Sequence, residues 1–583
     1  MRFSWWTRLV RRGRTTELES ARAVLPEQTW DGFPLPASLR AQALSRALGI
    51  SVTVASWLDR LGHVDPESTR RFLNPRLAEL TGPDAMLDRK VAAERIARAV
   101  REQQRIVVFG DYDCDGMTSA AIFTEALRAL GADVTPVLAS RFDGGYGFSA
   151  AALTRVLAKR PQLLVTCDCG SSDHAQLEKL GPLGVDAIVV DHHLVPDQPL
   201  PVLAFLNPHR PSCGFPYKGL ASCGLALSVL AAVRAELGRA LDLRPLLDLV
   251  AIGTIADVAP LDGDNRALVR AGLKVLSEAR RPGVRALLEL AKIEPGTALC
   301  AEDIAFRIAP RLNAPGRLGA PDLAMQLLLS PTLDVAHGLA AEIEQRQLER
   351  RAIQERMLEE ALAEVDREGY RDKPAIVIGR EGWNHGIVGI VAGRLASELA
   401  KPVVVIGFDA GIGRGSVRGP KGSQLHDAVS ACAPLLRRFG GHQAAAGLEV
   451  ELAQLDALRS AFEAACAAQP ALAVTDDAPR VRLAPGDALA KVLADLSELE
   501  PCGESNLAPG LALVGRVVSA REVTGGHLKL ELALDSGERL SGFGIGMGGR
   551  AATLSGDIAV AGKLRPDRYR GGNAIELKLD KIW

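Results

Sequence analysis

The chain is organised around residues 107–116, Val-Val-Phe-Gly-Asp-Tyr-Asp-Cys-Asp-Gly, where an apolar run passes straight into three aspartates on alternate positions. Carboxylates this close repel one another unless a cation lies between them. A calcium loop of the D-x-D-x-D-G kind is the alternative interpretation. That loop follows a helix and needs glutamate at its twelfth position, where this chain has Ile122. The stretch is better interpreted as a metal site at the carboxyl end of a β-strand.

Two further apolar runs end in residues that bind metals, Leu-Leu-Val-Thr-Cys-Asp at 163–168 and Ala-Ile-Val-Val-Asp-His-His at 187–193. In an open parallel sheet, ligands bind outside the carboxyl ends of the strands, so these side chains should converge. A fourth acidic residue, Asp257, follows the apolar stretch 249–256. Alone, Asp168 or Asp257 would usually be a cap or turn residue. Together with the two histidines they predict a shell suited to Mn²⁺ or Mg²⁺.

The surrounding pattern is that of a doubly wound α/β lobe, with a helix predicted at 88–103, another at 119–130 and a strand at 133–138. Cys167 and Cys169 flank Asp168 in a segment expected to be extended, so their side chains should point away from its carboxylate. The glycine-rich loop 141–147 is either a flexible lip near the site or an ordinary surface turn.

The motifs then resemble a known family. Residues 111–116 together with Asp168, Asp191-His192-His193 and Asp257 resemble the four motifs of the DHH phosphoesterases, in that order. Arg-Leu-Asn-Ala-Pro-Gly-Arg at 311–317 and Gly-Gly-His-Gln-Ala-Ala-Ala-Gly at 440–447 are similar to the RecJ branch of that family. The resemblance runs from about residue 75 to the C-terminus. It implies an exonuclease that degrades single-stranded DNA from the 5′ end in repair and recombination, with two divalent cations, Mn²⁺ or Mg²⁺.

The resemblance also assigns roles to individual residues. The catalytic group it implies is Asp111, Asp113, Asp115, Asp168, His192, His193 and Asp257. The metal ligands among them are Asp113, Asp115, Asp168, His192 and Asp257. Asp111 and His193 are expected beside these ligands or facing the substrate. Hydrolysis would use one cation to activate water and the other to stabilise the leaving oxygen.

A second set of residues is expected to hold the substrate phosphate through guanidinium groups, backbone N–H groups, a hydroxyl and an imidazole. The members are Arg311, Asn313, Arg317, Ser416, Arg418, Gly440, Gly441 and His442. Pro315 and Gly316 should break any helix across the first segment. The segments 413–419 and 440–442 are read as glycine-rich turns. A solvated turn is the alternative for the segment 311–317.

The rest of the chain predicts three further parts. A long salt-bridged helix is predicted at about 333–366, after which an α/β pattern restarts with strands at 374–378 and 402–406 and resembles the DHH-associated domain. Beyond about 475, five short β-rich segments predict a small barrel, and the resemblance implies an OB-fold. The basic, aromatic edge that would bind single strands consists of Lys563, Arg565, Arg568, Tyr569 and Arg570.

The predicted fold class is therefore α/β, with a DHH phosphoesterase lobe containing a parallel sheet, a long connecting helix, a DHH-associated α/β lobe and a C-terminal OB-like β-barrel. The expected boundaries are an N-terminal extension at 1–75, the DHH domain at 76–332, the connecting helix at 333–369, the DHH-associated domain at 370–470 and the OB-fold domain at 475–583.

Composition limits the remaining possibilities. With 583 residues the chain is too long for a single core. A net charge of −1 excludes a uniformly basic nucleic-acid binder, so any DNA path must be a local basic track. The nine cysteines are scattered and read as reduced packing residues. No run of eighteen apolar residues occurs, and residues 1–14 lack the apolar middle of a signal peptide. We expect a cytoplasmic monomer that binds single-stranded DNA and no membrane, with single-strand-binding protein and a helicase as implied partners.

Three alternatives share parts of this pattern. A family-II pyrophosphatase and a nanoRNase or cyclic-dinucleotide phosphodiesterase would carry the same metal motifs, but neither ordinarily needs a C-terminal barrel. A non-enzymatic DNA-binding relative of the replication-scaffold type would lack some of the acidic ligands, whereas this chain retains all of them.

Overall fold

The computed structural model describes residues 30–142, 147–442, 445–470, 479–567, 570–571 and 574–583, and the chain divides into two compact units. One unit contains the described residues up to Arg60 together with Arg480–Leu493 and Pro509–Trp583. The other contains Leu61–Pro479 and Ala494–Ala508. Across the described ranges, every helix is too short or too polar to span a bilayer.

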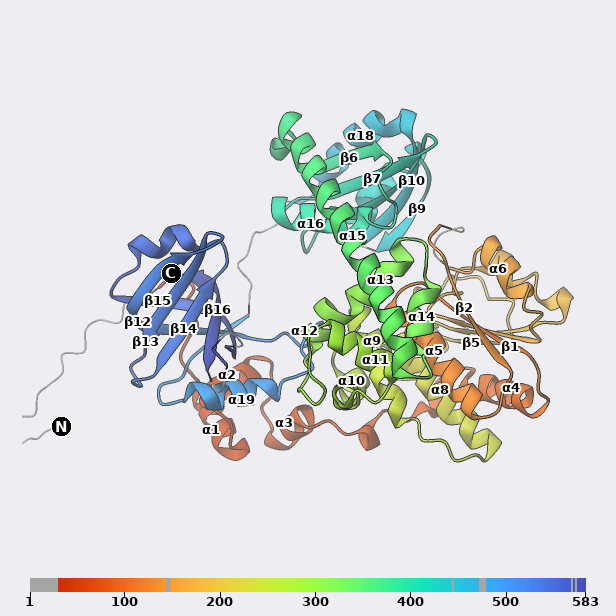
Figure 1. Ribbon diagram of the computed structural model, residues 1–583, viewed down its shortest axis with the longest axis horizontal. Helices are drawn as coiled ribbons and strands as arrows, with labels where there is room; N and C mark the ends of the chain where they lie inside the picture. Colours follow the sequence, from red (N-terminus) through yellow and green to blue (C-terminus); the bar gives the residue numbers. More distant parts are fainter. Residues whose placement is uncertain (1–29, 143–146, 443–444, 471–478, 568–569, 572–573) are drawn as a thin grey trace, which may run out of the picture. The chain divides into compact units, whose positions relative to one another are not determined.

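The first lobe of the larger unit is built on a sheet whose strands all run parallel, in the order β2-β1-β3-β4-β5 (Figure 1). The strands are β1 (Ile106–Gly110), β2 (Val134–Leu138), β3 (Leu163–Cys167), β4 (Asp186–Val190) and β5 (Ala204–Leu206). Every residue of β1 and β3 is buried, because helices cover both faces of the sheet. Alternate residues of β1 enter different cores, with Val108 on one face and Phe109 on the other. The predicted parallel α/β lobe is confirmed.

Helices before the lobe and around the sheet complete this part of the larger unit. They are α3 (Pro66–Leu73), α4 (Arg89–Arg101), α5 (Cys114–Ala129), α6 (Ala150–Leu157), α7 (His174–Leu177) and α8 (Ser222–Leu237). A helical layer follows, with α9 (Leu247–Ala256), α10 (Gly263–Glu278), α11 (Pro282–Leu290), α12 (Ala301–Asp303), α13 (Ala309–Arg317) and α14 (Asp322–Leu328). A π-helical turn at Ile304–Ile308 leads into α13.

The long helix α15 (Leu333–Arg367) joins the first lobe to the second. Its first half buries Ala336 and Ile343 in the core that contains the parallel sheet. Its second half buries Met357 and Val365 in a separate core built on β6 and α16. The predicted connecting helix is confirmed, and it is a structural member of both lobes.

The second lobe carries a mixed sheet in the order β6-β7-β8-β10-β9, in which only β6 and β7 run parallel. Its elements are β6 (Ile376–Glu381), α16 (Val388–Leu399), β7 (Val403–Asp409), β8 (Ile412–Arg418), α17 (Leu425–Ala431), β9 (Leu436–His442), β10 (Ala445–Glu451) and α18 (Leu455–Ala467).

Two predictions for this lobe were wrong. The glycine-rich segments 413–419 and 440–442 are not turns, because they form most of β8 and the end of β9. Their glycines make room for neighbouring groups. A Cβ at Gly413 would lie 2.5 Å from the Phe408 ring, and one at Gly441, where φ is +141°, would lie 2.4 Å from the Ala445 carbonyl oxygen. Glycine is used here for close approach within a sheet.

The smaller unit is a closed barrel of β12, β13, β14, β16 and β15, in which β15 pairs back onto β12 (Figure 1). The barrel predicted from five β-rich segments is confirmed. Its strands are β12 (Gly510–Val523), β13 (His527–Ala533), β14 (Arg539–Gly544), β15 (Asp557–Pro566) and β16 (Ile575–Ile582). A short sixth strand, β11 (Arg480–Arg482), pairs parallel with β12 and was not predicted. The helices α1 (Leu39–Leu48) and α2 (Val52–Arg60) belong to this unit, and α19 (Leu489–Ser497) begins in it.

Candidate metal centre

The centre forms where three neighbouring strands end together. Gly110, Cys167 and Val190 are direct partners across β1, β3 and β4. The next residue of each strand is an aspartate, and the ladder continues through these positions. The Asp111 N–H donates to the Cys167 carbonyl at 3.2 Å, and the Asp168 N–H donates to the Val190 carbonyl at 3.0 Å. Register therefore brings the strand-end carboxylates to one edge of the sheet, as the strand-end rule requires.

Asp168 leaves the sheet through a left-handed backbone turn. Its φ is +62°, so the expectation of an extended segment was wrong. A non-glycine residue in this region costs of order 1–3 kcal/mol and persists only when its surroundings hold it there. The Ser222 hydroxyl, at the start of α8, donates to the Asp168 carboxylate at 3.2 Å. The turn therefore ends β3 and holds the carboxylate of Asp168 inside the buried centre.

Two helix N-termini orient the remaining aspartates of the first motif. Asp113 caps α5 and accepts the N–H groups of Asp115 at 3.1 Å and Gly116 at 3.2 Å. The N-terminus of α8 binds the Asp115 carboxylate, because the N–H groups of Ser222 and Cys223 donate to its two oxygens at 2.7 and 2.9 Å. Backbone donors at a helix N-terminus stabilise a carboxylate and fix its direction.

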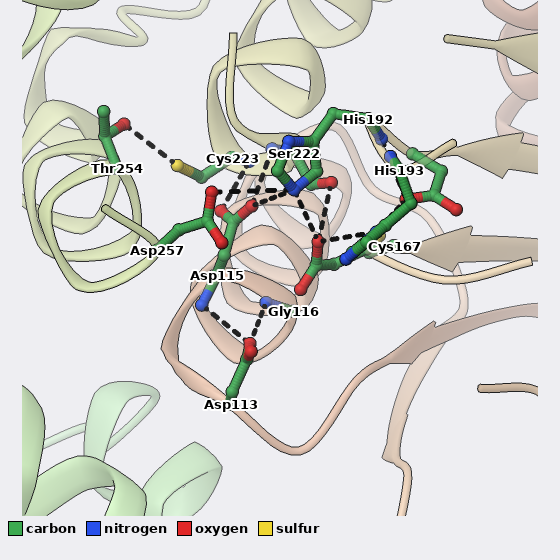
Figure 2. A network of polar contacts seen from close by, with 12 residues as sticks. Asp113, Asp115, Gly116, Cys167, His192, His193, Ser222, Cys223, Thr254 and Asp257 are labelled. Carbon is green, nitrogen blue, oxygen red and sulfur yellow. Dashed lines mark hydrogen bonds and ion pairs between the residues drawn. The ribbon is translucent and has the colours of Figure 1, made fainter. Parts of the chain in front are cut away.

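His192 lies at the middle of the centre (Figure 2). Its Nε2 is 3.2 Å from an Asp168 oxygen, 3.6 Å from an Asp257 oxygen and 3.9 Å from an Asp115 oxygen. Burial lowers the pKa of this imidazole, which favours the neutral ring. Nε2 is buried and has no hydrogen-bond partner among the described residues. A neutral nitrogen that faces three carboxylates without a hydrogen bond is arranged to share a cation with them.

The pKa values of the three aspartates that face His192 Nε2 are raised. Burial raises the pKa of Asp115, and burial followed by repulsion from Asp113 and Asp115 raises that of Asp168. Burial and then Asp115 raise the pKa of Asp257 to about 8. Ionised carboxylates this close need a compensating positive charge. Asp257 follows a helix, since it is the C-terminal cap of α9.

The residues present fit a hard divalent cation such as Mn²⁺ or Mg²⁺, because the donors are carboxylate oxygens and imidazole nitrogens. Ligand atoms within 4.8 Å of one another form three groups: Asp168, His192 and His193; Asp115, His192 and Asp257; and Asp111, Asp113 and Asp168. Asp168 and His192 each belong to two groups. Asp111 and His193, expected beside the ligands, therefore also lie within reach of a cation, and one Asp111 oxygen is buried without a hydrogen bond among the described residues.

Asp191 belongs to the quoted motif, but the sequence assigned it no role of its own. Its carboxylate accepts the N–H groups of Ser171, His192 and His193 at 3.1, 2.8 and 3.2 Å, and it pairs with His193 Nδ1 at 2.7 Å. Burial opposes ionisation, yet the hydrogen bond from His193 holds the pKa of Asp191 well below its usual range. Despite burial, the same bond raises the pKa of His193 to about 9. Asp191 thus orients the two histidines.

The predicted phosphate-binding segment is a helix, so the break expected at Pro315 and Gly316 was wrong. Pro315 lies in the last turn of α13, where the missing N–H removes one bond to Arg311 and the helix ends two residues later. Arg311 is engaged by Glu344 of α15 at 2.7 Å and by the Arg307 carbonyl at 2.6 Å. These contacts already occupy the Arg311 guanidinium. The Asn313 Oδ1 is buried without a hydrogen-bond partner among the described residues.

Arg317 and Arg418 have a different environment. Arg317 donates to the Gly386 carbonyl of the second lobe at 2.9 Å. Burial, and then repulsion from Arg141 and Arg350, lowers its pKa to about 10. Burial and Arg141 also lower the pKa of Arg418. The salt bridges found among the described residues involve none of Arg141, Arg317 and Arg418. Arginines that repel one another in this way favour a bound anion.

The other predicted phosphate and DNA contacts are placed as follows. Ser416 lies in β8, and Gly440 and Gly441 lie in β9, while the side chain of His442 falls outside the described residues. On the barrel, Lys563 and Arg565 lie in β15, and Arg565 pairs with Glu576 at 2.8 Å. Arg570 lies 3.8 Å from Asp567. Arg568, Tyr569 and the loop residues 143–146 lie outside the described residues. The barrel edge is thus partly neutralised by its own carboxylates.

Three known domain families match stretches of this chain. The DHH family, N-terminal domain matches residues 105–254, the DHHA1 domain matches 372–468 and the RecJ OB domain matches 481–581. The chain is 34% identical over 522 residues to the single-stranded-DNA-specific exonuclease RecJ of Dickeya dadantii, covering 84% of this chain and 90% of the relative. The chain belongs to the RecJ family.

Other RecJ proteins extend the comparison. The RecJ of Bacillus subtilis is 35% identical over 509 residues, which cover 86% of this chain but 64% of that longer relative, so the chain spans less than two thirds of its length. A crystal structure of RecJ from Thermus thermophilus in complex with Mn²⁺ superposes with a TM-score of 0.79 at 32% identity, over 94% of this chain and 78% of that one. The resemblance and the fold class predicted from the sequence are both confirmed.

Proposed function

We propose that this RecJ-family chain is a single-stranded-DNA-specific exonuclease that hydrolyses phosphodiester bonds from the 5′ end with two divalent cations, Mn²⁺ or Mg²⁺. The observation that carries the proposal is the His192 imidazole, whose buried Nε2 faces Asp115, Asp168 and Asp257 and makes no hydrogen bond within the described part of the chain. The names of the relatives supply the substrate class. The direction of digestion rests on the family resemblance.

In this proposal Asp113, Asp115, Asp168, His192 and Asp257 hold the cations. When bound, the cations activate a water molecule and neutralise charge on the leaving oxygen. The protein's own contribution is rigidity, because the N-termini of α5 and α8 fix the carboxylates of Asp113 and Asp115 before any cation arrives.

Arg317 and Arg418 are proposed as the phosphate contacts, together with Ser416, Gly440, Gly441 and His442. The support for the two arginines is electrostatic, since burial and a neighbouring arginine lower the pKa of both guanidinium groups. Arg311 is proposed to act indirectly, since Glu344 already occupies its guanidinium. Its pairing with α15 would hold α13, and therefore Arg317, in place.

The partners and setting follow from the same proposal. Single-stranded DNA would be the substrate, and repair and recombination would supply it. Single-strand-binding protein and a helicase, a monomeric state and a cytoplasmic location remain part of the proposal, supported by the family resemblance.

The test is degradation of single strands that carry a block at the 5′ end or at the 3′ end, with Mn²⁺, with Mg²⁺ and with a chelator. A 5′ block should stop digestion and a 3′ block should not. The Asp168→Asn variant serves as the inactive control, and blunt duplex serves as the specificity control. Digestion that continues in the chelator would refute the metal site, and a block that acts only at the 3′ end would refute the direction.

A further inference from the structure

The loop that follows the proposed ligand Asp257 is held by a segment from far along the chain. α9 ends at Asp257, and the next residue, Val258, has φ +60°, an uncommon conformation for a β-branched side chain. The N–H groups of Val258 and Ala259 close the helix end onto the Ile255 and Thr254 carbonyls, at 3.2 Å each. The loop then reaches Leu261, whose N–H donates to the Glu504 carbonyl at 2.8 Å. The turn at Val258 is thus held on its C-terminal side by a hydrogen bond to Glu504, which lies about 240 positions later in the sequence.

The clamping segment, residues 498–506, is itself tied to the first lobe by a buried arginine. Arg266 of α10 is 2% exposed, and the hydrogen bonds that its guanidinium makes to described residues all go to backbone carbonyl groups. It donates to Leu499 at 2.9 Å, Pro501 at 3.3 Å and Glu498 at 3.4 Å, and from Nε to Phe72 at 2.8 Å. The same guanidinium lies 3.9 Å from the centroid of the Phe72 ring. Arg266 therefore gathers carbonyl groups of the segment at a fixed place beside the loop 258–261. The neighbouring Arg270 adds bonds to the Glu498 and Glu500 carbonyl groups at 2.8 and 2.7 Å, near the start of the segment.

Hydrogen bonds within the segment also hold its conformation. Asn506 is 3% exposed, and its Nδ2 donates to the carbonyl groups of Leu499 at 3.0 Å and Pro501 at 2.7 Å. Its backbone pairs with Gly503, whose N–H donates to the Asn506 carbonyl at 2.9 Å. Space around the segment is tight, since a Cβ added to Gly503 would lie 2.8 Å from Leu261 Cδ1. A small movement of the segment would therefore be passed to the loop and to the end of α9.

From these contacts we infer that Arg266 is a positioning residue for metal binding: it anchors residues 498–506, and the Glu504 carbonyl of that segment fixes the loop that orients Asp257. The inference rests on the proposed role of Asp257 as a metal ligand. Residues that orient a ligand from behind typically change metal affinity by 10- to 100-fold when they are removed. Since Arg266 acts through a further segment, we expect the lower end of that range.

The experiment measures Mn²⁺ binding to the chelator-treated full-length protein by the electron paramagnetic resonance signal of the free ion. Arg266→Met should weaken one of the two binding events by about tenfold, and Arg266→Lys should recover part of that loss, since a lysine can also donate to carbonyl groups. Asn506→Ala loosens the same segment without changing Arg266 and should weaken the same event. The Mn²⁺ concentration that gives half-maximal turnover should rise by the same factor.

The matched control is Arg95→Met. Arg95 is 5% exposed, contacts Asp186 at 2.5 Å and the Gln162 carbonyl at 3.2 Å, and lies at the opposite ends of the strands. Its loss should lower thermal stability and leave Mn²⁺ affinity within twofold of wild type. The inference is overturned if Arg266→Met and Asn506→Ala bind Mn²⁺ as wild type does, or if Arg95→Met weakens binding equally. If Arg266→Met does not fold, Asn506→Ala decides.

Asp257→Asn separates this inference from the proposed function. Loss of Mn²⁺ affinity in Asp257→Asn but not in the segment variants would refute the positioning role and leave the metal site standing. Unchanged affinity in Asp257→Asn would refute the ligand assignment itself.

Discussion

The substitution Gly116→Ala tests whether the close approach of α5 to β1 sets the geometry of the metal centre. Gly116 follows the last aspartate of the first motif, and an added Cβ would lie 2.5 Å from the Asp111 backbone nitrogen and 2.8 Å from its Cα. The nearest atoms are backbone, so no side chain can rotate away. To restore an ordinary contact of 3.4 Å, the helix and the strand end must separate by about 0.9 Å.

A displacement of that size exceeds the tolerance of the site. Metal–ligand distances are held to within about 0.2 Å, and misplacing a reacting group by about 1 Å can cost about 100-fold in rate. Overpacking of this kind also destabilises a core by about 1–3 kcal/mol. We therefore expect Gly116→Ala to fold, with a lower melting temperature, and to lose at least about 100-fold in turnover at saturating Mn²⁺.

The matched control is Gly338→Ala in α15, where an added Cβ would meet no atom of the described residues within 4 Å. Replacing a glycine inside a helix by alanine should stabilise it by about 0.5–1 kcal/mol and leave turnover unchanged. Turnover, Mn²⁺ affinity and thermal unfolding are measured on both variants beside wild type. Wild-type turnover and affinity in Gly116→Ala would show that the helix can retreat without disturbing the centre, and the reasoning would fail.

Three further predictions address the site and the barrel. Asp168→Asn and His192→Ala each remove a group shared by two candidate metal positions, so turnover should fall by several orders of magnitude with an unchanged circular dichroism spectrum; activity near wild type in both would contradict the assignment. Burial and Asp115 raise the pKa of Asp257 to about 8 in the metal-free protein, so the folded state keeps a proton that the unfolded chain has released. Between about pH 5 and 7 the free energy of unfolding should therefore fall by about 1.4 kcal/mol for each unit of rising pH and each such proton, and the slope should fade above about pH 8. Thermal unfolding in chelator checks this slope, which Asp257→Asn should flatten. A chain ending at residue 508 keeps the segment bound by Arg266 and should cleave very short oligonucleotides nearly normally. It should bind long strands more weakly, and the slope of log affinity against log salt concentration should be shallower by about 0.7 per lost phosphate contact. Unchanged affinity and slope would mean that the barrel does not bind DNA.

The convergence of the metal residues could be predicted because it needs only local information. An apolar run that ends in Asp or Asp-His-His, repeated along a doubly wound pattern, reaches one edge of a parallel sheet whatever the surrounding loops do. The groups that orient those residues could not be found in this way. Ser222 and Cys223 hold Asp115 across more than 100 positions of sequence, and nothing near them distinguishes the start of α8 from any other helix.

The errors share one cause, which is that local rules were applied where tertiary contacts decide. Proline was taken to end a helix, but Pro315 lies in a last turn that α15 holds through Glu344 and Arg311. Glycine was taken to mark turns, but Gly413 and Gly441 lie in strands and make room for Phe408 and Ala445. A single sequence does not distinguish a glycine that needs an unusual φ from one that needs an absent Cβ.

The helix α15 fixes the rotation of the two lobes of the larger unit relative to each other about the helix axis. Ile343 is fixed in one core and Met357 in the other, with a continuous helix between them. Adding or removing one residue in that interval would turn one core by about 100° and shift it by about 1.5 Å relative to the other. Seven residues would nearly restore the angle, to within about 20°, but would lengthen the span by about 10 Å. The number of residues in this interval is therefore constrained to the single residue, whereas its exposed side chains could change in chemical character without moving either core.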